Sequence, residues 1–172
     1  MKIAARPEIL RGLQRLDAHV SDVIDEAVTI CEVPAPPFAE SRRAAHVAGR
    51  MAALGLGAPR TDAIGNVICE LPGAPERPTV ALTAHLDTVF GAEVPIGVRR
   101  EGDRLAGPGI GDNSMALAAL LWLGAALADL PDRGTLVLAA NVGEEGLGNL
   151  RGAKALWEQF GEHADAWVIL EG

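Results

Sequence analysis

Three uncharged segments of the chain are each followed, within two residues, by a histidine or an acidic residue, and this pattern constrains the fold most. The segments are residues 79–84, 135–142 and 166–170, and they are followed by His85-Leu86-Asp87, Gly143-Glu144-Glu145-Gly146 and Glu171-Gly172. Short apolar runs of this length are typical of strands buried within a sheet. Open α/β sheets bind ligands at the edge formed by the carboxyl ends of their strands. We therefore expect these polar groups to gather along one edge of a sheet.

Helical periodicity fills most of the chain between these strands. The predicted helices are residues 8–31, 41–54, 114–130 and 149–160, and the further strands are residues 66–71 and a hairpin at 97–106. Alternation of helices and strands predicts an α/β fold with a mostly parallel sheet. The length of 172 residues suits one domain, or one and a fraction.

Charge and composition exclude several classes of partner. The formal net charge of −8 disfavours binding to phosphate backbones, so we expect no nucleic-acid partner. The longest uncharged apolar run, residues 115–128, is too short to span a bilayer and predicts a buried helix. Residues 1–8 lack the apolar stretch of a signal peptide, and Cys31 and Cys69 are isolated. We therefore expect buried, reduced thiols, no membrane partner and a cytoplasmic location.

A fourth acidic group, Asp112, follows the glycine-rich segment 107–111 at the start of the long apolar helix. Several carboxylates at one edge of a sheet repel one another, and a bound cation would offset this repulsion. One imidazole combined with several carboxylates suits Zn²⁺, with Mn²⁺ or Co²⁺ as alternatives. The sequence therefore predicts a metal site at this edge.

Each of these groups also has a simpler interpretation when it is taken alone. Asp112 can cap the helix that follows it. Glu144 and Glu145 can be solvated loop residues, and Glu171 can belong to a frayed end. A lone His85 at a strand end is more often a polar residue with ordinary partners than a ligand. Taken together, these interpretations require separate segments to place acids at the same edge by coincidence, so the metal site is favoured.

The remaining candidates for chemistry are weaker. His19, His46 and His163 lack carboxylates at a suitable spacing and are interpreted as structural or surface residues. The glycines of residues 107–111 do not form a G-x-G-x-x-G pattern, and a carboxylate follows where a phosphate would bind. The sequence also has no P-loop and no G-x-S-x-G nucleophile motif. A nucleotide-binding domain is therefore a distant alternative.

Four motifs in this order resemble the co-catalytic zinc peptidase and deacylase family, which includes peptidase T, glutamate carboxypeptidase, aminoacylase, acetylornithine deacetylase and succinyl-diaminopimelate desuccinylase. The motifs are Ala84-His85-Leu86-Asp87-Thr88-Val89, Gly109-Ile110-Gly111-Asp112-Asn113, Gly143-Glu144-Glu145-Gly146 and Leu170-Glu171-Gly172. The residues around the glutamate pair are most similar to the peptidase T-like branch. The resemblance implies a three-layer α/β/α sandwich.

The resemblance also implies a role for each matching residue. The implied metal ligands are His85, Asp112, Glu145 and Glu171, with Asp112 bridging two zinc ions. Asp87 would orient the imidazole of His85, and Glu144 would be the general base. A cis peptide bond between Asp112 and Asn113 is expected as well. The implied reaction is hydrolysis of amide bonds in short peptides or N-acyl amino acids by a metal-activated water.

The chain departs from the family in length. Family members are about twice as long, carry a further metal-ligating histidine near their C-terminus, and insert a second, smaller domain. We therefore expect residues 1–172 to be the N-terminal portion of a metallopeptidase catalytic domain, without the lid or dimerisation domain. A chain of this kind should be weakly active or inactive, with an exposed sheet edge that favours a homo-oligomer. The alternative is a non-catalytic fragment or remnant that associates with itself or a partner.

Overall fold

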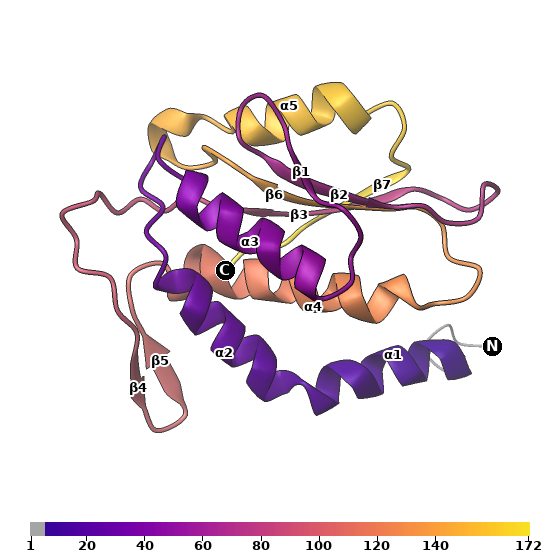
Figure 1. Ribbon diagram of the computed structural model, residues 1–172, viewed down its shortest axis with the longest axis horizontal. Coiled ribbons are helices and arrows are strands. Elements are labelled where there is room, and N and C mark those ends of the chain that lie inside the picture. The colour runs from indigo at the N-terminus through magenta and orange to yellow at the C-terminus, as the bar shows by residue number, and fades with distance from the viewer. Residues whose placement is uncertain (1–5) are drawn as a thin grey trace.

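The fold is described from a computed structural model, in which residues 6–172 are described (Figure 1). The helices are α1 (Pro7–Ala18), α2 (Val20–Cys31), α3 (Ser41–Ala53), α4 (Ala116–Ala128) and α5 (Arg151–Phe160). The strands are β1 (Arg60–Thr61), β2 (Val67–Leu71), β3 (Val80–His85), β4 (Arg99–Glu101), β5 (Arg104–Ala106), β6 (Leu136–Asn141) and β7 (Ala166–Ile169). A π-helical segment, Ile110–Met115, leads into α4, and a 3₁₀ turn, Gly146–Gly148, precedes α5.

The central sheet has five strands in the order β1-β2-β6-β3-β7. Strands β6 and β7 both run parallel to β3, while β2 is antiparallel to β6 and β1 is antiparallel to β2. Among the described strands of this sheet, β2 alone therefore runs against the others. This topology confirms the predicted α/β fold with a mostly parallel sheet. Strands β4 and β5 form the predicted hairpin, separate from the sheet.

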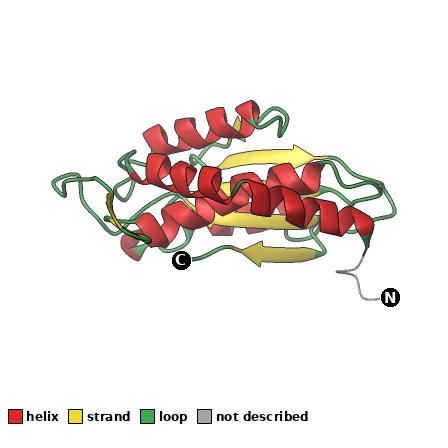
Figure 2. Ribbon diagram, turned by 90° about the horizontal axis from the view of Figure 1, so that it is seen from below, coloured by secondary structure: helices red, strands yellow, loops and turns green. Residues whose placement is uncertain are grey.

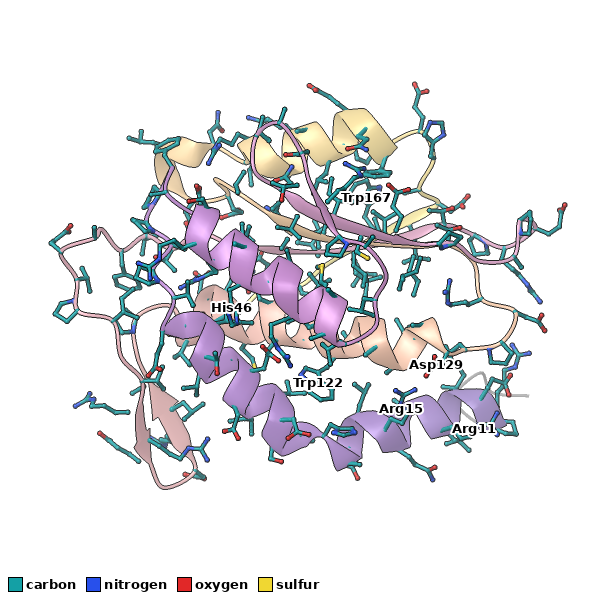
Figure 3. The ribbon with its side chains drawn as sticks, in the orientation of Figure 1. Arg11, Arg15, His46, Trp122, Asp129 and Trp167 are labelled. Atoms are coloured by element: carbon teal, nitrogen blue, oxygen red, sulfur yellow. The ribbon has the colours of Figure 1, made fainter. Side chains whose placement is uncertain are left out.

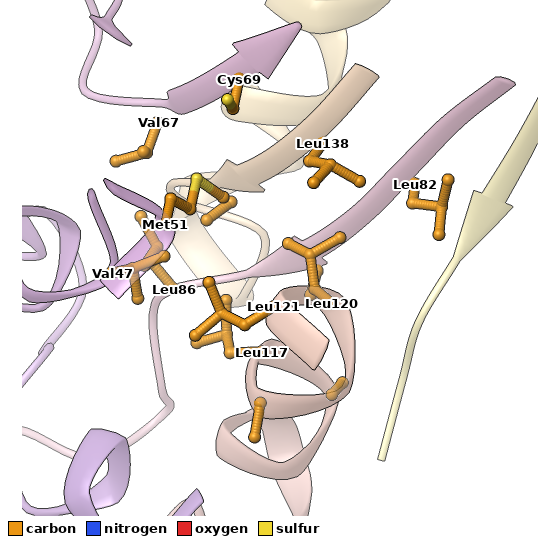
Figure 4. Packing of buried hydrophobic residues seen from close by; sticks show 14 of the residues in the cluster. Val47, Met51, Val67, Cys69, Leu82, Leu86, Leu117, Leu120, Leu121 and Leu138 are labelled. Atoms are coloured by element: carbon orange, nitrogen blue, oxygen red, sulfur yellow. The ribbon is translucent and has the colours of Figure 1, made fainter. Parts of the chain in front are cut away.

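Helices cover both faces of the sheet and complete a three-layer α/β/α sandwich. Helices α1 to α4 lie on one face and α5 lies on the other (Figure 1), and the view from below shows the larger helical layer in front of the strands (Figure 2). Alternate strand residues point to opposite faces. Leu82 and Leu138 therefore pack with Leu120 of α4 (Figure 4), whereas Val137 packs with Leu156 of α5.

Helix α4 is at the centre of the larger layer. Leu117, Leu120 and Leu121 are fully buried against the sheet and the neighbouring helices (Figure 4). Together with the π-helical segment, α4 forms a stretch, Ile110–Ala128, that is long and apolar enough to cross a membrane by length and composition alone. Half of this stretch is buried inside the fold, and α4 itself has 13 residues, against about 20 for a membrane-spanning helix. The stretch therefore fits the buried core helix that the sequence predicted.

The single helix predicted over residues 8–31 is wrong, because the structure divides it into α1 and α2 at His19. This residue has non-helical backbone angles, with φ −113° and ψ 17°, and its ring lies 4.9 Å from that of Trp122. Helix α1 thereby follows the surface of α4, and Arg15 forms an ion pair with Asp129 just beyond the end of α4 (Figure 3). Apolar periodicity continues through the break, so the sequence pattern does not reveal it.

Two smaller differences concern the ends of elements. Helix α4 begins at Ala116 rather than at residue 114, because Asp112 and Asn113 have non-helical dihedral angles. Strand β1 was not predicted, since its two residues are too few to show an alternating pattern.

Candidate metal centre

Parallel strand pairing brings the predicted polar groups to one edge of the sheet. His85 is the last residue of β3. The N–H of Leu170 donates to the carbonyl oxygen of Thr83 at 2.8 Å, so Glu171 follows at the level of His85. Asp112 reaches the same edge from the π-helical segment before α4. The site is therefore built from residues that are far apart in the sequence.

The imidazole of His85 is shared by two groups of acidic side chains. Its Nε2 lies 2.9 Å from Asp112 Oδ1 and 3.4 Å from Glu171 Oε2. A second group joins His85 to Glu144 and Glu145. Within each group the potential ligand atoms all lie within 4.8 Å of one another. The structure thus brings together the residues that the sequence singled out as metal ligands and general base.

The tautomer of His85 follows from its hydrogen bonds. Its Nδ1 lies 2.9 Å from the main-chain carbonyl oxygen of Asp87, which can only accept a hydrogen bond. Nδ1 therefore carries a proton, and in the neutral ring the lone pair of Nε2 faces Asp112 and Glu171. This is the orientation that a metal-ligating imidazole requires. The carboxylate of Asp87 lies 3.6 Å from Nδ1, too far for a hydrogen bond, so the main chain orients the ring.

The carboxylate of Asp87 instead holds the turn that follows β6. Asp87 is fully buried, and its two oxygens accept the main-chain N–H groups of Glu144 at 3.0 Å and Glu145 at 2.9 Å. Burial alone would raise the pKa of Asp87, but the nearby imidazole of His85 and these main-chain bonds outweigh burial and lower it. Asp87 is therefore an ionised anchor that links His85 to both glutamates.

The charges at the site are unbalanced. Burial would lower the pKa of His85, but Asp87, Glu171 and Asp112 together outweigh it and raise that pKa to about 9. Partial burial, together with the negative charge of neighbouring carboxylates, raises the pKa of Glu145 and of Glu171. Without a bound cation, the protein thus relieves part of the repulsion by keeping the ring of His85 protonated.

The donor set fits a divalent cation. A bound cation would replace the proton on His85 Nε2 and offset the negative charge of the carboxylates. One imidazole nitrogen and several carboxylate oxygens match the ligand preferences of zinc, and also those of manganese and cobalt. Nε2 of His85, which is the free nitrogen of the neutral ring, faces the carboxylates directly, so the residues present are compatible with the metal that the motifs implied.

The other histidines lie outside both groups. His19 packs against Trp122, His46 Nε2 is 3.9 Å from the carboxylate of Glu26, and His163 is exposed. Within residues 6–172, His85 is therefore the only imidazole in the acidic groups.

The segment that carries Asp112 is attached to the end of β7. The peptide bond between Asp112 and Asn113 is cis, as the motif resemblance predicted. The side-chain amide of Asn113 donates to the carbonyl oxygen of Leu170 at 3.2 Å. This bond connects the segment that carries Asp112 to the residue before Glu171.

A fully buried arginine that the sequence did not single out lies beneath the site. Arg43, in the first turn of α3, donates to the carbonyl oxygens of Leu86 and Val33 at 2.9 Å and of Cys31 at 3.4 Å. Burial lowers the pKa of Arg43 to about 10, although Cys31 and Asp87 partly counter this. The bond to Leu86 fixes the main chain between His85 and Asp87. The spacing along the helix could have predicted its burial, because Arg43 lies on the same helix face as the buried residues four and eight positions later.

A mostly parallel α/β/α sandwich with a histidine and several acids at the carboxyl edge of its sheet defines a metallopeptidase-like protein. Residues 66–170 match the model of Peptidase family M28, and the chain belongs to this family. The matched range covers more than half of the chain and contains His85, Asp112, Glu144 and Glu145. This match confirms the resemblance to metallopeptidases that the motifs predicted. No curated protein sequence matches the chain.

Solved structures of peptidases share the fold. Aminopeptidase PepT from Bacillus cereus has a TM-score of 0.74 and 24% identity, over 88% of this chain and 43% of its own. Human carnosine dipeptidase 1 has a TM-score of 0.72 and 18% identity, over 95% of this chain and 41% of its own. A glutaminyl cyclase from an Acidobacteriales bacterium has a TM-score of 0.61 and 19% identity, over 92% of this chain and 57% of its own. The chain therefore spans about two fifths of the length of these peptidases, and the fold alone does not decide the reaction.

Proposed function

We propose that the protein hydrolyses amide bonds in short peptides or N-acyl amino acids with the help of bound zinc. The observation that carries this proposal is the position of His85 Nε2, which faces Asp112 Oδ1 at 2.9 Å and Glu171 Oε2 at 3.4 Å while Nδ1 bonds to a main-chain oxygen. Membership in a peptidase family supports the reaction class. Manganese and cobalt are the alternative metals.

In this proposal His85, Asp112 and Glu171 hold one ion, and Asp112 and Glu145 contribute to a second. Such ions, when bound, polarise the scissile carbonyl group and lower the pKa of a water molecule. The described residues offer the first ion three ligands and the second ion two. We therefore expect one ion to bind more tightly than the other, and residues 1–172 alone to be weakly active.

Glu144 is proposed as the general base. Its main-chain N–H is fixed by the buried Asp87, and its carboxylate lies within the acidic group around His85. A carboxylate in this place can accept a proton from the attacking water and return it to the departing amine. Asp87 then acts as a positioning residue, because it holds Glu144 and Glu145 through their main-chain atoms and His85 through its own carbonyl oxygen.

The test combines zinc content with peptide hydrolysis. The dialysed protein should retain about one zinc per chain and release amino acids from dipeptides or tripeptides. Glu144→Gln should keep the zinc and reduce the rate by about 100-fold or more, because it removes the base. Glu162→Gln is the matched control, since it removes one acidic group from an exposed position outside the site.

Two results would contradict the proposal. A folded, zinc-loaded protein with no hydrolysis above the Glu144→Gln background would favour the non-catalytic alternative. Cyclisation of an N-terminal glutamine without hydrolysis would instead assign the chemistry of the glutaminyl cyclase that shares this fold.

We also propose that the chain forms a homo-oligomer through the outer edge of β7. Described strands pair with β7 on its β3 side alone, and Val168 and Ile169 are 44% and 66% exposed. Exposed apolar edge strands favour pairing with another chain. Light scattering after size-exclusion chromatography measures this directly. A monomer at all concentrations, or an oligomer that Ile169→Lys leaves intact, would contradict the proposed interface.

A further inference from the structure

The turn after β6 is held by side chains rather than by a neighbouring strand. Four successive main-chain N–H groups, those of residues 142 to 145, each donate to a side-chain oxygen. The acceptors are Asn66 Oδ1 at 3.0 Å, Glu40 Oε1 at 3.1 Å, and Asp87 Oδ1 and Oδ2 at 3.0 and 2.9 Å. All three acceptor residues are at most 4% exposed. Buried oxygens from three separate segments thus determine the path of the turn.

Glu40 is the acceptor whose role is least expected. It is the residue before α3, and its Oε1 accepts three donors. These are the N–H of Gly143 at 3.1 Å, the N–H of Phe38 at 3.2 Å and Arg151 Nη2 at 2.8 Å. A buried carboxylate is tolerated only when an opposite charge or hydrogen bonds compensate it. Arg151, whose guanidinium also lies 5.2 Å from the ring centre of Phe38, provides that charge.

Gly143 shows how closely this pair approaches the turn. It has φ +58°, a conformation that residues with a side chain rarely adopt. A Cβ atom at this position would lie 2.2 Å from Arg151 Nε, so the close approach of Arg151 also requires glycine. The carbonyl oxygens on the same turn are bonded as well. That of Gly143 accepts the N–H of Arg151, and that of Glu144 accepts the N–H of Leu150. The turn and the start of α5 therefore form one unit, which Glu40 connects to α3.

We propose that Glu40 and Arg151 form a positioning pair for Glu144 and Glu145. The carboxylate of Glu40 fixes the direction in which the chain leaves β6, and Asp87 fixes the next two residues. Charge-assisted bonds of this kind are stronger and more directional than neutral ones. Neither residue belongs to the two acidic groups at His85, and both bond to the main chain of Gly143, so both act through the main chain. The consequence for metal binding and catalysis rests on the function proposed above.

The first experiment measures amide hydrogen exchange, which needs neither metal nor substrate. Glu40→Ala should increase exchange at Gly143 and Glu144 by at least about 10-fold relative to the amides of β6. Glu40→Gln should restore most of the protection, because its carbonyl oxygen still accepts the N–H of Gly143. The matched control is Glu26→Ala, which breaks another buried ion pair, with Arg50 at 2.7 Å, outside the acidic groups. It should leave the turn protected.

The second experiment measures zinc affinity by calorimetry with the same variants. Loss of a group that orients a ligand typically weakens metal binding by about 10–100-fold. Glu40→Ala should therefore weaken zinc binding by about 10-fold, and Glu40→Gln by less than about threefold. Glu26→Ala should bind zinc as the wild type does, even where it lowers the melting temperature.

The outcomes separate the two proposals. Unchanged exchange at Gly143 in Glu40→Ala would overturn the positioning pair. Increased exchange with unchanged zinc affinity would overturn its role at the metal centre and leave a structural bond. If the wild type neither binds zinc nor cleaves peptides, the proposed function fails, while hydrogen exchange still decides whether Glu40 holds the turn.

Discussion

The inner and outer halves of the site are held in different ways. The inner half consists of His85, Asp87 and the turn that carries Glu144 and Glu145, and its anchors are 2% and 0% exposed. The outer half consists of Asp112 and Glu171, whose side chains are 56% and 48% exposed and contact the protein through the imidazole of His85. Folding therefore fixes the inner half, whereas we expect the carboxylates of the outer half to be held in place only when a cation binds between them.

The strongest way to test this comparison is to remove the inner anchor. Asp87→Ala leaves the partly buried N–H groups of Glu144 and Glu145 without acceptors, at a cost of up to about 1–3 kcal/mol each before relaxation. We expect the free energy of unfolding to fall by about 3 kcal/mol in urea titrations with excess chelator. Asp87→Asn, which keeps one acceptor oxygen, should lose less. Equal losses for the two variants would show that the carboxylate does not hold the turn.

Removing the shared imidazole should separate metal binding from stability. His85→Ala should weaken zinc binding by about 100-fold or more, equivalent to roughly 2.7 kcal/mol, because both acidic groups lose their nitrogen ligand. Calorimetric titration of zinc measures this change. His163→Ala removes an exposed histidine outside the site and should bind zinc normally. A His85→Ala protein with unchanged affinity would place the zinc elsewhere.

The outer carboxylates should contribute to the stability of the protein when metal is bound and not when it is absent. In chelator, Asp112→Asn should change the free energy of unfolding by less than about 0.5 kcal/mol, since the side chain of Asp112 is 56% exposed and solvent screens its charge. In zinc, the same variant should lose most of the increase in melting temperature that zinc gives the wild type. Thermal unfolding with and without zinc tests both statements. A large loss of stability in chelator would mean that the outer half is also fixed by folding.

Metal removal alone should produce the smallest and most local effect. Chelation should increase amide exchange in the segment Ile110–Met115 by a few-fold and leave residues 142–145 unchanged. Buried side-chain oxygens accept the main-chain N–H groups of the second segment, whereas the N–H groups of Ile110 and Ser114 donate to main-chain oxygens. Exchange resolved by residue and compared with zinc-loaded protein measures this. Equal changes in both segments would remove the distinction between the two halves.

The polar edge could be predicted from the sequence because its signals are local. Each strand is a short apolar run with a polar group at its end or a few residues beyond it, so parallel pairing brings His85, Glu145 and Glu171 to one edge of the sheet. The supports of the site are different. Glu40 bonds to Gly143, 103 residues later, and in the sequence it resembles any acidic residue before a helix. Such contacts depend on the packing of α3 against the sheet, which no local pattern records.

The role of Asp87 shows that the sequence also leaves contacts undetermined within a recognised motif. Asp87 lies two residues after His85 in the sequence, so a contact between Asp87 and the imidazole was predictable. The structure shows that this contact is made by the main-chain oxygen, which leaves the carboxylate free to hold Glu144 and Glu145. Sequence spacing indicates which residues meet but not which of their atoms do.

The strand order also sets how the chain can fold. Strand β6 pairs with β2 on one side and β3 on the other, although both precede it by more than fifty residues (Figure 1). During synthesis, β2 and β3 leave the ribosome without the strand that joins them, so their apolar residues stay uncovered until residue 141 has emerged. Non-local pairing of this kind slows folding and exposes intermediates to aggregation. The central position of a late strand thus leaves β2 and β3 exposed to aggregation until β6 joins them.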